Sequence, residues 1–418
     1  MEDSRIAQRL RDQIVVFSGE LTCGLCKAAR RFVTEMLYGI QARQSVMLSE
    51  IGRSLNERIA LKKTETRLSN ELGRVGLRER VMENLLRRAS GRIGQDTLLA
   101  LDLSDISKAY ARGMEYMADV RDGSTGELSR GYWTLQVIGV ELEETRMTPL
   151  YGHLYSQLAP GFVSENEEIV RAVDTVSHHT EGRGIWVMDR GADRRKLYGP
   201  LLDRRLRFII RLVGDRHLIC SGRAVLAREL AGRCSTLYAD RYVREQSGRE
   251  SIYTIEYGYR RVRLPGRREK MTLVVVRGFG EEPMMLLTNV DVKRTRRSCS
   301  FVVQSYLRRW QIEDTIRCTK QSYGVENVRL LSYERLQNMM VLVLCAMYFA
   351  AVYLGDRARL RILAHHALVA ARRLFGIPDF RYYALADGIR KLLEGVRRPL
   401  LARVGAGPPE LQTSFFNT

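Results

Sequence analysis

Four polar residues between positions 306 and 320 have the types and the spacing of a site that handles phosphate. Arg309, Glu313 and Lys320 follow Tyr306 at offsets of three, seven and fourteen, and an α-helix of about 3.6 residues per turn places all four along one side. A carboxylate set among Arg, Lys and Tyr suits a metal ion bound next to phosphate-binding groups. The same spacing is also typical of a helix stabilised by ion pairs four residues apart.

Apolar residues flank this stripe, which indicates that it faces protein or ligand and not bulk water. The flanking residues are Val303, Leu307 and Trp310 on one side and Ile312 and Ile316 on the other. The helical spacing puts Arg308, Gln311, Thr315 and Thr319 on the far face.

Two other stretches place an acid on or after a strand. Residues 97–106, TLLALDLSDI, predict a strand in which alternation sets Asp102 and Asp105 on opposite faces. Only one of them is then expected to face a site, and we assign Asp102, with Asp105 as the alternative. Residues 184–188, GIWVM, predict a buried strand that ends in Asp189. This carboxylate would lie at the C-terminal edge of a sheet, where open α/β sheets place their sites.

An acid on a first strand, an acid after a later strand and an acid on a helix form the constellation of a ribonuclease-H-like fold. Three stretches resemble DDE transposases of the insertion-sequence-4 family. The signature Y-x2-R-x3-E-x6-K is matched at all four positions from Tyr306 to Lys320, ALDLSDISK resembles the segment of the first catalytic Asp, and WVMDRGAD resembles that of the second. The resemblance covers roughly residues 97–350.

The resemblance implies a metal-dependent enzyme. Asp102, Asp189 and Glu313 would be the catalytic acids and would bind two Mg²⁺ ions, with Mn²⁺ as a substitute. In two-metal sites one ion activates water or a 3′-hydroxyl and the other stabilises the leaving oxygen of the phosphodiester. The remaining signature residues, Tyr306, Arg309 and Lys320, would contact DNA.

The resemblance also implies the DNA partners and the reaction. The substrates would be the terminal inverted repeats of the insertion sequence that encodes the protein, together with target DNA. The reaction would be cut-and-paste transposition, in which the ends are cleaved and transferred. A homodimer is expected in the synaptic complex.

The sequence divides into five parts of a mixed α/β protein. Residues 1–95 predict a helical, DNA-binding N-terminal domain, and residues 96–213 predict the first part of the ribonuclease-H-like core. Residues 214–292 alternate β-forming residues, as in SIYTIEYGYRRVRL, and predict a β-strand insertion domain. Residues 293–355 complete the core, and residues 356–418 predict a helical C-terminal region.

Two short helices within residues 1–95 leave two interpretations open. One helix ends near Leu55, with Ser45 or Ser49 as its cap, and LKKTETRLSNEL forms the next. Such a pair is typical of a helix-turn-helix module and equally of a small helical bundle. In a helix-turn-helix module, the residues free to meet DNA would be Lys62, Lys63, Thr64 and Arg67.

Composition agrees with a DNA-binding protein of the cytoplasm. A net charge of +20 and a pI near 9.9 favour a polyanionic partner. Seven scattered cysteines form no secreted disulfide framework, and the first residues do not resemble a signal peptide. Residues 339–355 are apolar and uncharged but predict a buried core helix, not a membrane span. We therefore expect a cytoplasmic, nucleoid-associated protein of a bacterium or archaeon.

Two rival functions use parts of the same pattern. The first is a ribonuclease-H-like nuclease or resolvase, against which the β-rich insertion and the four-residue signature argue. The second is a DNA-binding or repressor protein derived from a transposase and without catalysis. The presence of all three acids argues against this second function.

Overall fold

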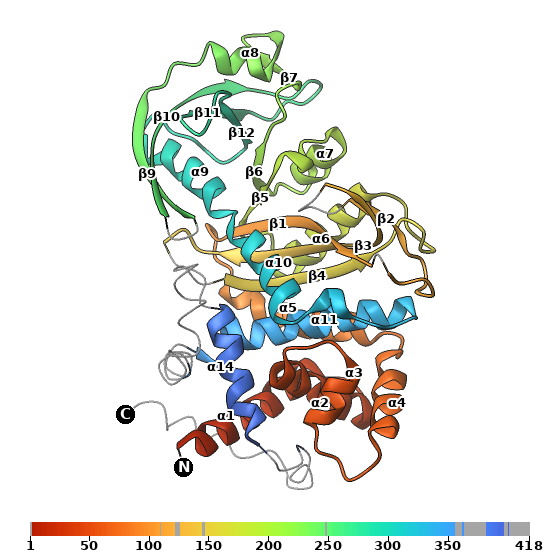
Figure 1. Cartoon of the computed structure of the whole chain (residues 1–418). Coiled ribbons are helices and arrows are strands. Elements are labelled where there is room, and N and C mark those ends of the chain that lie inside the picture. Colours follow the sequence, from red (N-terminus) through yellow and green to blue (C-terminus); the bar gives the residue numbers. More distant parts are fainter. Residues whose placement is uncertain are drawn as a thin grey trace.

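The N-terminal part of the chain is helical, as predicted. The computed structural model describes residues 2–108, 110–121, 126–143, 147–246, 249–355, 362, 382–396 and 400. Five helices and a 3₁₀ turn precede the first strand (Figure 1): α1 Glu2–Leu21, α2 Lys27–Arg43, α3 Leu48–Ser54, α4 Leu61–Leu72, α5 Leu77–Ala89 and η1 Ser90–Arg92. Helix α2 is central to this group, since an unbroken run of its residues from Phe32 to Ala42 is buried.

The cap predicted for α3 is wrong, although the helix itself is present. Helix α3 begins after Met47, which makes no side-chain cap. The hydroxyl of Ser45 accepts a hydrogen bond from Met47 N at 3.1 Å and so lies in the preceding turn, while Ser49 lies inside the helix. A serine oxygen that bonds the backbone two residues on stabilises a turn, and this competes with capping.

The core sheet has the strand order of a ribonuclease-H-like fold. Its elements are β1 Leu98–Ser107, β2 Ala118–Arg121, β3 Leu128–Val140, β4 Met147–Tyr155, α6 Glu165–His179, β5 Ile185–Met188, η2 Arg190–Ala192, α7 Arg195–Asp203 and β6 Arg207–Arg211. Strands β1, β3 and β4 form an antiparallel meander, and β5 and β6 continue from β1 in parallel. The predicted mixed α/β class with this core is confirmed.

Local sequence explains how β5 comes to lie beside β1. All four residues of β5 are buried, as expected of an apolar strand covered on both faces. Gly184, just before it, has φ +98, and a Cβ there would lie 2.7 Å from the Leu99 side chain. Only glycine fits this approach to β1 without strain. On the preceding helix, the Ser164 side chain accepts from Glu167 N and caps α6, as predicted.

The β-rich segment after the core extends the same sheet. It contains β7 His217–Cys220, β8 Arg223–Leu226, α8 Ala227–Gly232, β9 Tyr238–Gln246, β10 Arg249–Val262, β11 Met271–Arg277 and β12 Met284–Thr288. Strand β12 pairs with β6 antiparallel, so the core and the β9–β12 strands form one ten-stranded sheet. The division of this segment into a separate domain at residues 214–292 stays a prediction.

The signature stretch is not one continuous helix. Helix α9, Arg296–Arg308, ends before Arg309, and α10, Gln311–Ser322, begins after Trp310. At this break Arg309 N bonds Tyr306 O at 3.1 Å and Glu313 N bonds Trp310 O at 3.1 Å. These bonds span three residues, so the chain turns more tightly than an α-helix. The side chain of Arg309, at this turn, is buried.

Helix α10 is covered on its far face as well. Thr315 and Thr319 are buried, and their hydroxyls contact the sulfur atoms of Met147 at 2.7 Å and of Met347 at 2.8 Å. Trp310, expected beside the stripe, is instead 44% exposed. Helix α10 is therefore packed between the sheet and the helix that follows it.

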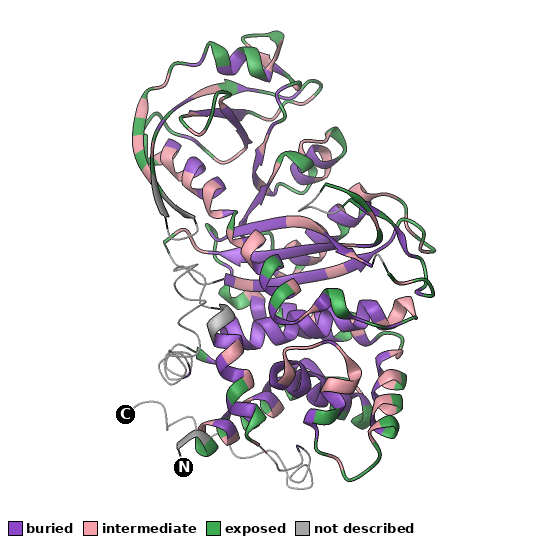
Figure 2. Ribbon diagram, viewed as in Figure 1, coloured by how far each residue is buried: buried purple, intermediate pink, exposed green. Residues whose placement is uncertain are grey.

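The predicted apolar helix lies in the core. Helix α11, Tyr333–Tyr348, follows the 3₁₀ turn η3, Val325–Asn327, and continues into the π-helical turn η4, Phe349–Tyr353. Tyr333–Tyr353 is long and apolar enough to cross a membrane, but 94% of its most apolar window is buried inside the protein (Figure 2). Of the predicted C-terminal helical region, the structure describes α14, Tyr382–Glu394, and most of the remainder lies outside the described residues.

Candidate active site

The sheet and helix α10 bring the three predicted acids to one region. The parallel register of β1 and β5 pairs Ala100 with Val187, so two residues farther on Asp102 and Asp189 come level with each other. Asp189 directly follows β5, and its Oδ1 accepts from Gly191 N at 2.8 Å. Glu313 lies in the first turn of α10, where a carboxylate is favoured by the helix dipole.

The three carboxylates are close enough to affect one another. Burial raises the pKa of Asp102, Arg309 opposes this rise, and the negative charges of Asp189 and Glu313 add to it, so that the pKa is raised to about 6. The Asp102 side chain is 20% exposed and therefore accessible to a small ligand. An acid kept in a partly buried, negatively charged place is typical of a functional site.

Arg309 lies between two of these acids. Its Nη1 is 3.3 Å from Asp102 Oδ2, and its Nη2 is 2.7 Å from Glu313 Oε1. The side chain is only 7% exposed, and the guanidinium lies 5.7 Å from the centre of the Tyr306 ring. Tyr306 is itself buried. The structure thus brings together Tyr306, Arg309 and Glu313 of the predicted stripe and joins them to Asp102.

The second acid of β1 also contacts the signature stretch, although alternation along the strand assigns it to the face opposite Asp102. That only one of the two acids faces the active site stays a prediction. Lys320 Nζ lies 3.2 Å from Asp105 Oδ1, while Asp102 contacts Arg309. Asp102 and Asp105 are three residues apart on one strand, yet the signature stretch reaches both: Arg309, just before α10, contacts Asp102, and Lys320 of α10 contacts Asp105. Asp105 is 4% exposed in its side chain and is bound to a lysine, whereas Asp102 lies among the acids.

Two residues that the sequence did not single out complete this contact. Lys320 Nζ is also 3.1 Å from Glu326 Oε1, and the ammonium of Lys108 donates to the carbonyls of Glu326 and Val328. Lys108 is buried, and burial lowers its pKa to about 8. Its place three residues after Asp105 in ALDLSDISK was the available signal, but a lysine at a strand end is ordinarily solvated.

The donor set suits a hard divalent cation, because carboxylate oxygens are its preferred ligands. The pKa of Asp102, raised first by burial and then by the neighbouring acids, supports this fit, since a bound cation would stabilise the charged carboxylate. Within the described residues, no three His, Cys, Asp or Glu side chains are placed to hold an ion as they stand. Arg309 supplies the positive charge between Asp102 and Glu313.

Exposed cations border the site on the side of β5. Arg190 follows Asp189 directly, and Arg195 and Lys196 begin α7; all three are exposed and form no ion pair in the part of the chain that the structure describes. The neighbouring Arg194 differs, since it pairs with Glu165 at 2.5 Å. Unpaired cations beside a cluster of acids are suited to holding a phosphate backbone near that cluster.

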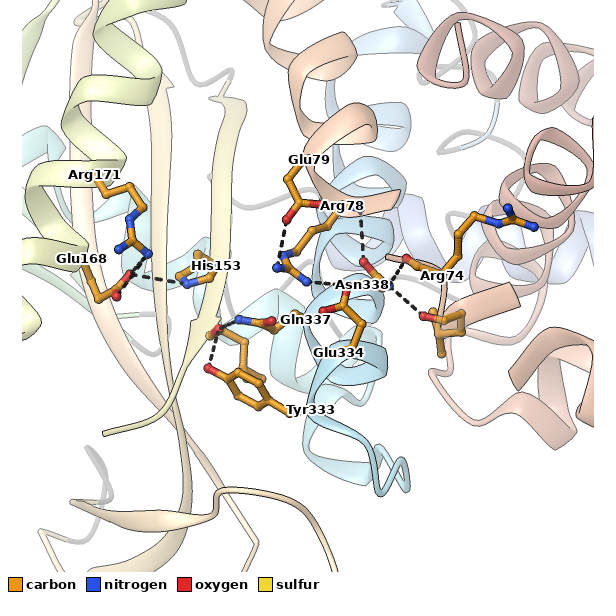
Figure 3. Close-up of polar contacts among 12 residues, drawn as sticks. Arg74, Arg78, Glu79, His153, Glu168, Arg171, Tyr333, Glu334, Gln337 and Asn338 are labelled. Carbon is orange, nitrogen blue, oxygen red and sulfur yellow. Dashed lines mark hydrogen bonds and ion pairs between the residues drawn. The ribbon is translucent and has the colours of Figure 1, made fainter. Parts of the chain in front are cut away.

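A second polar group lies where the N-terminal helices meet the core (Figure 3). Glu168 contacts His153 at 3.5 Å and Arg171 at 3.1 Å, and Arg78 contacts Glu334 at 2.6 Å across the junction of α5 and α11. These residues line a cleft of about 520 Å³. Its charges pair among themselves, which indicates that they fasten the helices to the sheet.

A known protein family matches the part of the chain that contains two of the three acids. Residues 147–349 match the family model described as the transposase DDE domain; this range contains Asp189, Glu313 and the other signature residues and begins after Asp102. Among solved structures, the chain is similar to that in a cryo-EM structure of the piggyBac transposase synaptic complex with hairpin DNA, at 10% identity and a TM-score of 0.43 over 92% of this chain and 82% of that one. No protein of curated function matches the chain.

Proposed function

We propose that this chain, a DNA transposase by its DDE domain, cleaves and joins phosphodiesters with Asp102, Asp189 and Glu313. The observation that carries the proposal is the convergence of these acids: two parallel strands set Asp102 level with Asp189, and α10 adds Glu313. Burial, and after it the charges of Asp189 and Glu313, raise the pKa of Asp102 to about 6. Separate structural ion pairs would not need three mutually repelling carboxylates.

The three acids would hold Mg²⁺, most simply as two ions, with Mn²⁺ as a substitute. When bound, the ions would activate water or a 3′-hydroxyl and stabilise the oxygen that leaves phosphorus. The protein's part is to hold the carboxylates on rigid elements, two on the sheet and one on a packed helix. Asp102 can bind a cation only when deprotonated, which links cation binding to pH.

The signature cations would hold the DNA backbone beside the acids. Arg309 presents a planar guanidinium suited to two-point contact with phosphate, and its two acid contacts fix it at the site. Lys320 would contribute a second positive charge from the far end of α10. The ring of Tyr306 lies 5.7 Å from the guanidinium of Arg309, and the DNA contact expected of Tyr306 would be made through its hydroxyl.

The substrates would be the terminal inverted repeats of the element that encodes this chain, and then target DNA. Cleavage and transfer of both ends require two sites, so a homodimer in the synaptic complex is the simplest assembly. Membership of the insertion-sequence-4 family is part of the proposal and rests on the match of Tyr306, Arg309, Glu313 and Lys320 to its signature.

A cleavage assay on DNA from the flanks of the encoding gene tests this function. Wild type should nick these ends in Mg²⁺ or Mn²⁺ and not in chelator. Asp102→Asn, Asp189→Asn and Glu313→Gln should each lose cleavage by about a thousandfold or more, because losing metal-held charge stabilisation costs several kcal/mol at roughly 1.4 kcal/mol per tenfold. Asp215→Asn, at an acid whose side chain is 75% exposed, is the control and should cleave normally.

The rival functions predict other results in the same assay. A repressor derived from a transposase would bind the ends and give no metal-dependent product with any variant. A nuclease of the same fold would cut but would not join a cut end to a second DNA molecule. Normal cleavage by Asp102→Asn would contradict the assignment of the first acid.

A further inference from the structure

We propose that Asp105 is a positioning residue which, with Glu326 and Lys108, clamps the end of α10 onto the end of β1 and thereby sets Glu313 against Asp102. The inference rests on the proposed function, because it assigns a role in the cleavage reaction to a residue that contacts neither ion nor DNA. Its basis is a continuous set of contacts between the two elements that carry two of the three acids.

The first half of the clamp is a lysine held by two carboxylates. Lys320, in the last turn of α10, has its ammonium 3.2 Å from Asp105 Oδ1 and 3.1 Å from Glu326 Oε1. Asp105 comes from β1 and Glu326 from the turn η3 that follows α10. Separating a buried carboxylate from an ammonium is costly, because a charge removed from water loses the attraction of an opposite charge. The contact therefore fixes the helix end.

The second half of the clamp is a lysine that binds the backbone. Lys108, at the end of β1, donates from Nζ to the carbonyl oxygen of Glu326 and, at 2.6 Å, to that of Val328. The same turn is thus held through the Glu326 side chain by Lys320 and through its carbonyl by Lys108. Since Asp105 lies near the end of β1 and Lys108 directly follows that strand, the contacts close into a ring.

The ring fixes a distance that matters to the acids. Along β1, Asp105 lies three residues beyond Asp102; along α10, Lys320 lies seven residues, about two turns, beyond Glu313. The two elements are therefore joined at two points, through Arg309 beside the acids and through Lys320 at the helix end. With two joints the helix cannot pivot about either one. A displacement of about 1 Å in a catalytic group can cost about a hundredfold in rate.

Cleavage of the element ends by four variants tests the clamp. Asp105→Asn should reduce the rate tenfold to a hundredfold and raise the Mg²⁺ concentration needed for half-maximal rate, while binding to the ends in chelator stays unchanged or tightens. Glu326→Gln, at a more exposed carboxylate, should act in the same direction by a smaller factor. Lys320→Met should also reduce cleavage, and the double variant Asp105→Asn with Lys320→Met should be no slower than the slower single variant.

The matched control is Glu35→Gln. It also breaks the ion pairs of a buried carboxylate, with Arg31 and Arg67, but in the N-terminal helices. If loss of any buried ion pair slowed cleavage through general destabilisation, this variant would show the same Mg²⁺ shift. The clamp predicts the wild-type Mg²⁺ dependence for it. If Asp105→Asn fails to fold, the Mg²⁺ dependence of Glu326→Gln decides.

Mn²⁺ binding without DNA, followed by the electron paramagnetic resonance signal of free Mn²⁺, separates this inference from the proposed function. Asp102→Asn should lose Mn²⁺ binding, and Asp105→Asn should bind Mn²⁺ several-fold more weakly than wild type. A wild type that neither binds Mn²⁺ nor cleaves would overturn the proposed function and this inference with it. Equal Mn²⁺ affinity and equal Mg²⁺ dependence in wild type, Asp105→Asn and Glu326→Gln would overturn the clamp alone, as would rate losses that multiply in the double variant.

Discussion

Arginine has two different uses in the N-terminal helices and at the edge of the sheet beside Asp189. In the helices many of the arginines are paired; Arg31 and Arg67, for example, bind Glu57 at 2.7 and 2.9 Å. At the sheet edge Arg190 and Arg195 are exposed, with no ion pair among the described residues. Paired cations cancel their own field, whereas unpaired ones attract a polyanion. The net charge of +20 is therefore unevenly available to DNA.

The acids of the two regions differ in the same way. Burial alone would raise the pKa of Glu57, but hydrogen bonds from Thr64 and Arg67 lower it. At Asp102, burial together with Asp189 and Glu313 outweighs Arg309, and the pKa is raised to about 6. In the N-terminal helices, partners within the fold stabilise the charged carboxylate of Glu57. Beside Asp189, the charged form of Asp102 is left for a bound ligand to stabilise. This difference supports the proposal that the second region is the functional one.

The largest expected effect comes from removing the cations of the sheet edge. The triple variant Arg190→Gln, Arg195→Gln, Lys196→Gln should bind DNA more weakly and lower the slope of log affinity against log salt by up to about three, roughly one for each lost phosphate contact. Binding measured by fluorescence anisotropy across a salt series gives this slope.

The control for that experiment is a triple variant of paired arginines. Arg80, Arg87 and Arg88 are comparably exposed but bind Glu83 and Glu20. Their replacement by Gln should leave the salt slope unchanged and lower the melting temperature slightly. If both triple variants lowered the salt slope equally, DNA binding would depend only on the total charge of the protein. The contrast between paired and unpaired cations would then not identify the binding surface.

The second expected effect is on the pH dependence of cleavage. With the pKa of Asp102 raised to about 6, a proton competes with the cation below that pH, and cleavage should fall as pH decreases. Raising the Mg²⁺ concentration should move the midpoint to lower pH, because the cation favours the charged carboxylate. Rates measured from pH 5 to 8 at two Mg²⁺ concentrations check this. A midpoint that does not respond to Mg²⁺ would place the titrating group elsewhere.

The positions of the three acids could be predicted from sequence because each depends on local patterning. The apolar run of β5 indicates where Asp189 follows a strand, and the spacing of 306–320 places Glu313 on a helix. The break at Arg309 could not be predicted from the sequence. Arg309 and Trp310 keep helical backbone angles, so the break is seen only in the hydrogen bonds of this turn. One of these hydrogen bonds is donated by the backbone N–H of Arg309 to Tyr306 O. The burial of the Arg309 side chain depends in turn on its contact with Asp102 of β1.

The roles of Asp105 and Lys108 could not be predicted either, because they depend on contacts between distant parts of the chain. Alternation along β1 assigned Asp105 to the other face, yet Lys320 reaches it from α10. In the N-terminal helices, Thr64 and Arg67 were expected to be free for DNA, but both bind Glu57. Spacing along one element shows which residues share a face and not what another element brings to them.

A smaller effect tests whether the N-terminal helices bind DNA at all. On α4, Lys63 is exposed and Lys62 makes only a weak contact of 3.7 Å with Glu65 while remaining 86% exposed. Lys62→Gln with Lys63→Gln should lower the salt slope by at most about two units if α4 contacts the backbone, as in a helix-turn-helix module. An unchanged slope would favour the alternative, a helical bundle that supports the core. The same anisotropy series measures it.

The smallest effects are on stability, and they should have opposite signs in the two regions. The folded pKa of Glu57 is lowered, so its pairs stabilise the fold above the unfolded pKa of about 4.5 and are lost as pH falls. Glu57→Gln should therefore melt a few degrees lower than wild type at pH 7, since its pairs contribute about 0.2 to 1 kcal/mol each. The difference should shrink as pH falls below the unfolded pKa of about 4.5 toward the lowered folded pKa.

Asp102 should show the reverse dependence in metal-free buffer. Its folded pKa lies above its unfolded value, so charging it costs stability as pH rises from about 4 to 6. Asp102→Asn, which carries no charge, should gain melting temperature relative to wild type over that interval, while Glu57→Gln loses it. Melting curves of the three proteins between pH 3.5 and 7 measure both slopes. If the melting temperatures of the two variants changed with pH in the same direction relative to wild type, the fold would stabilise the charged form of Asp102 as it does that of Glu57. The proposed active-site acids would then behave like a structural ion pair.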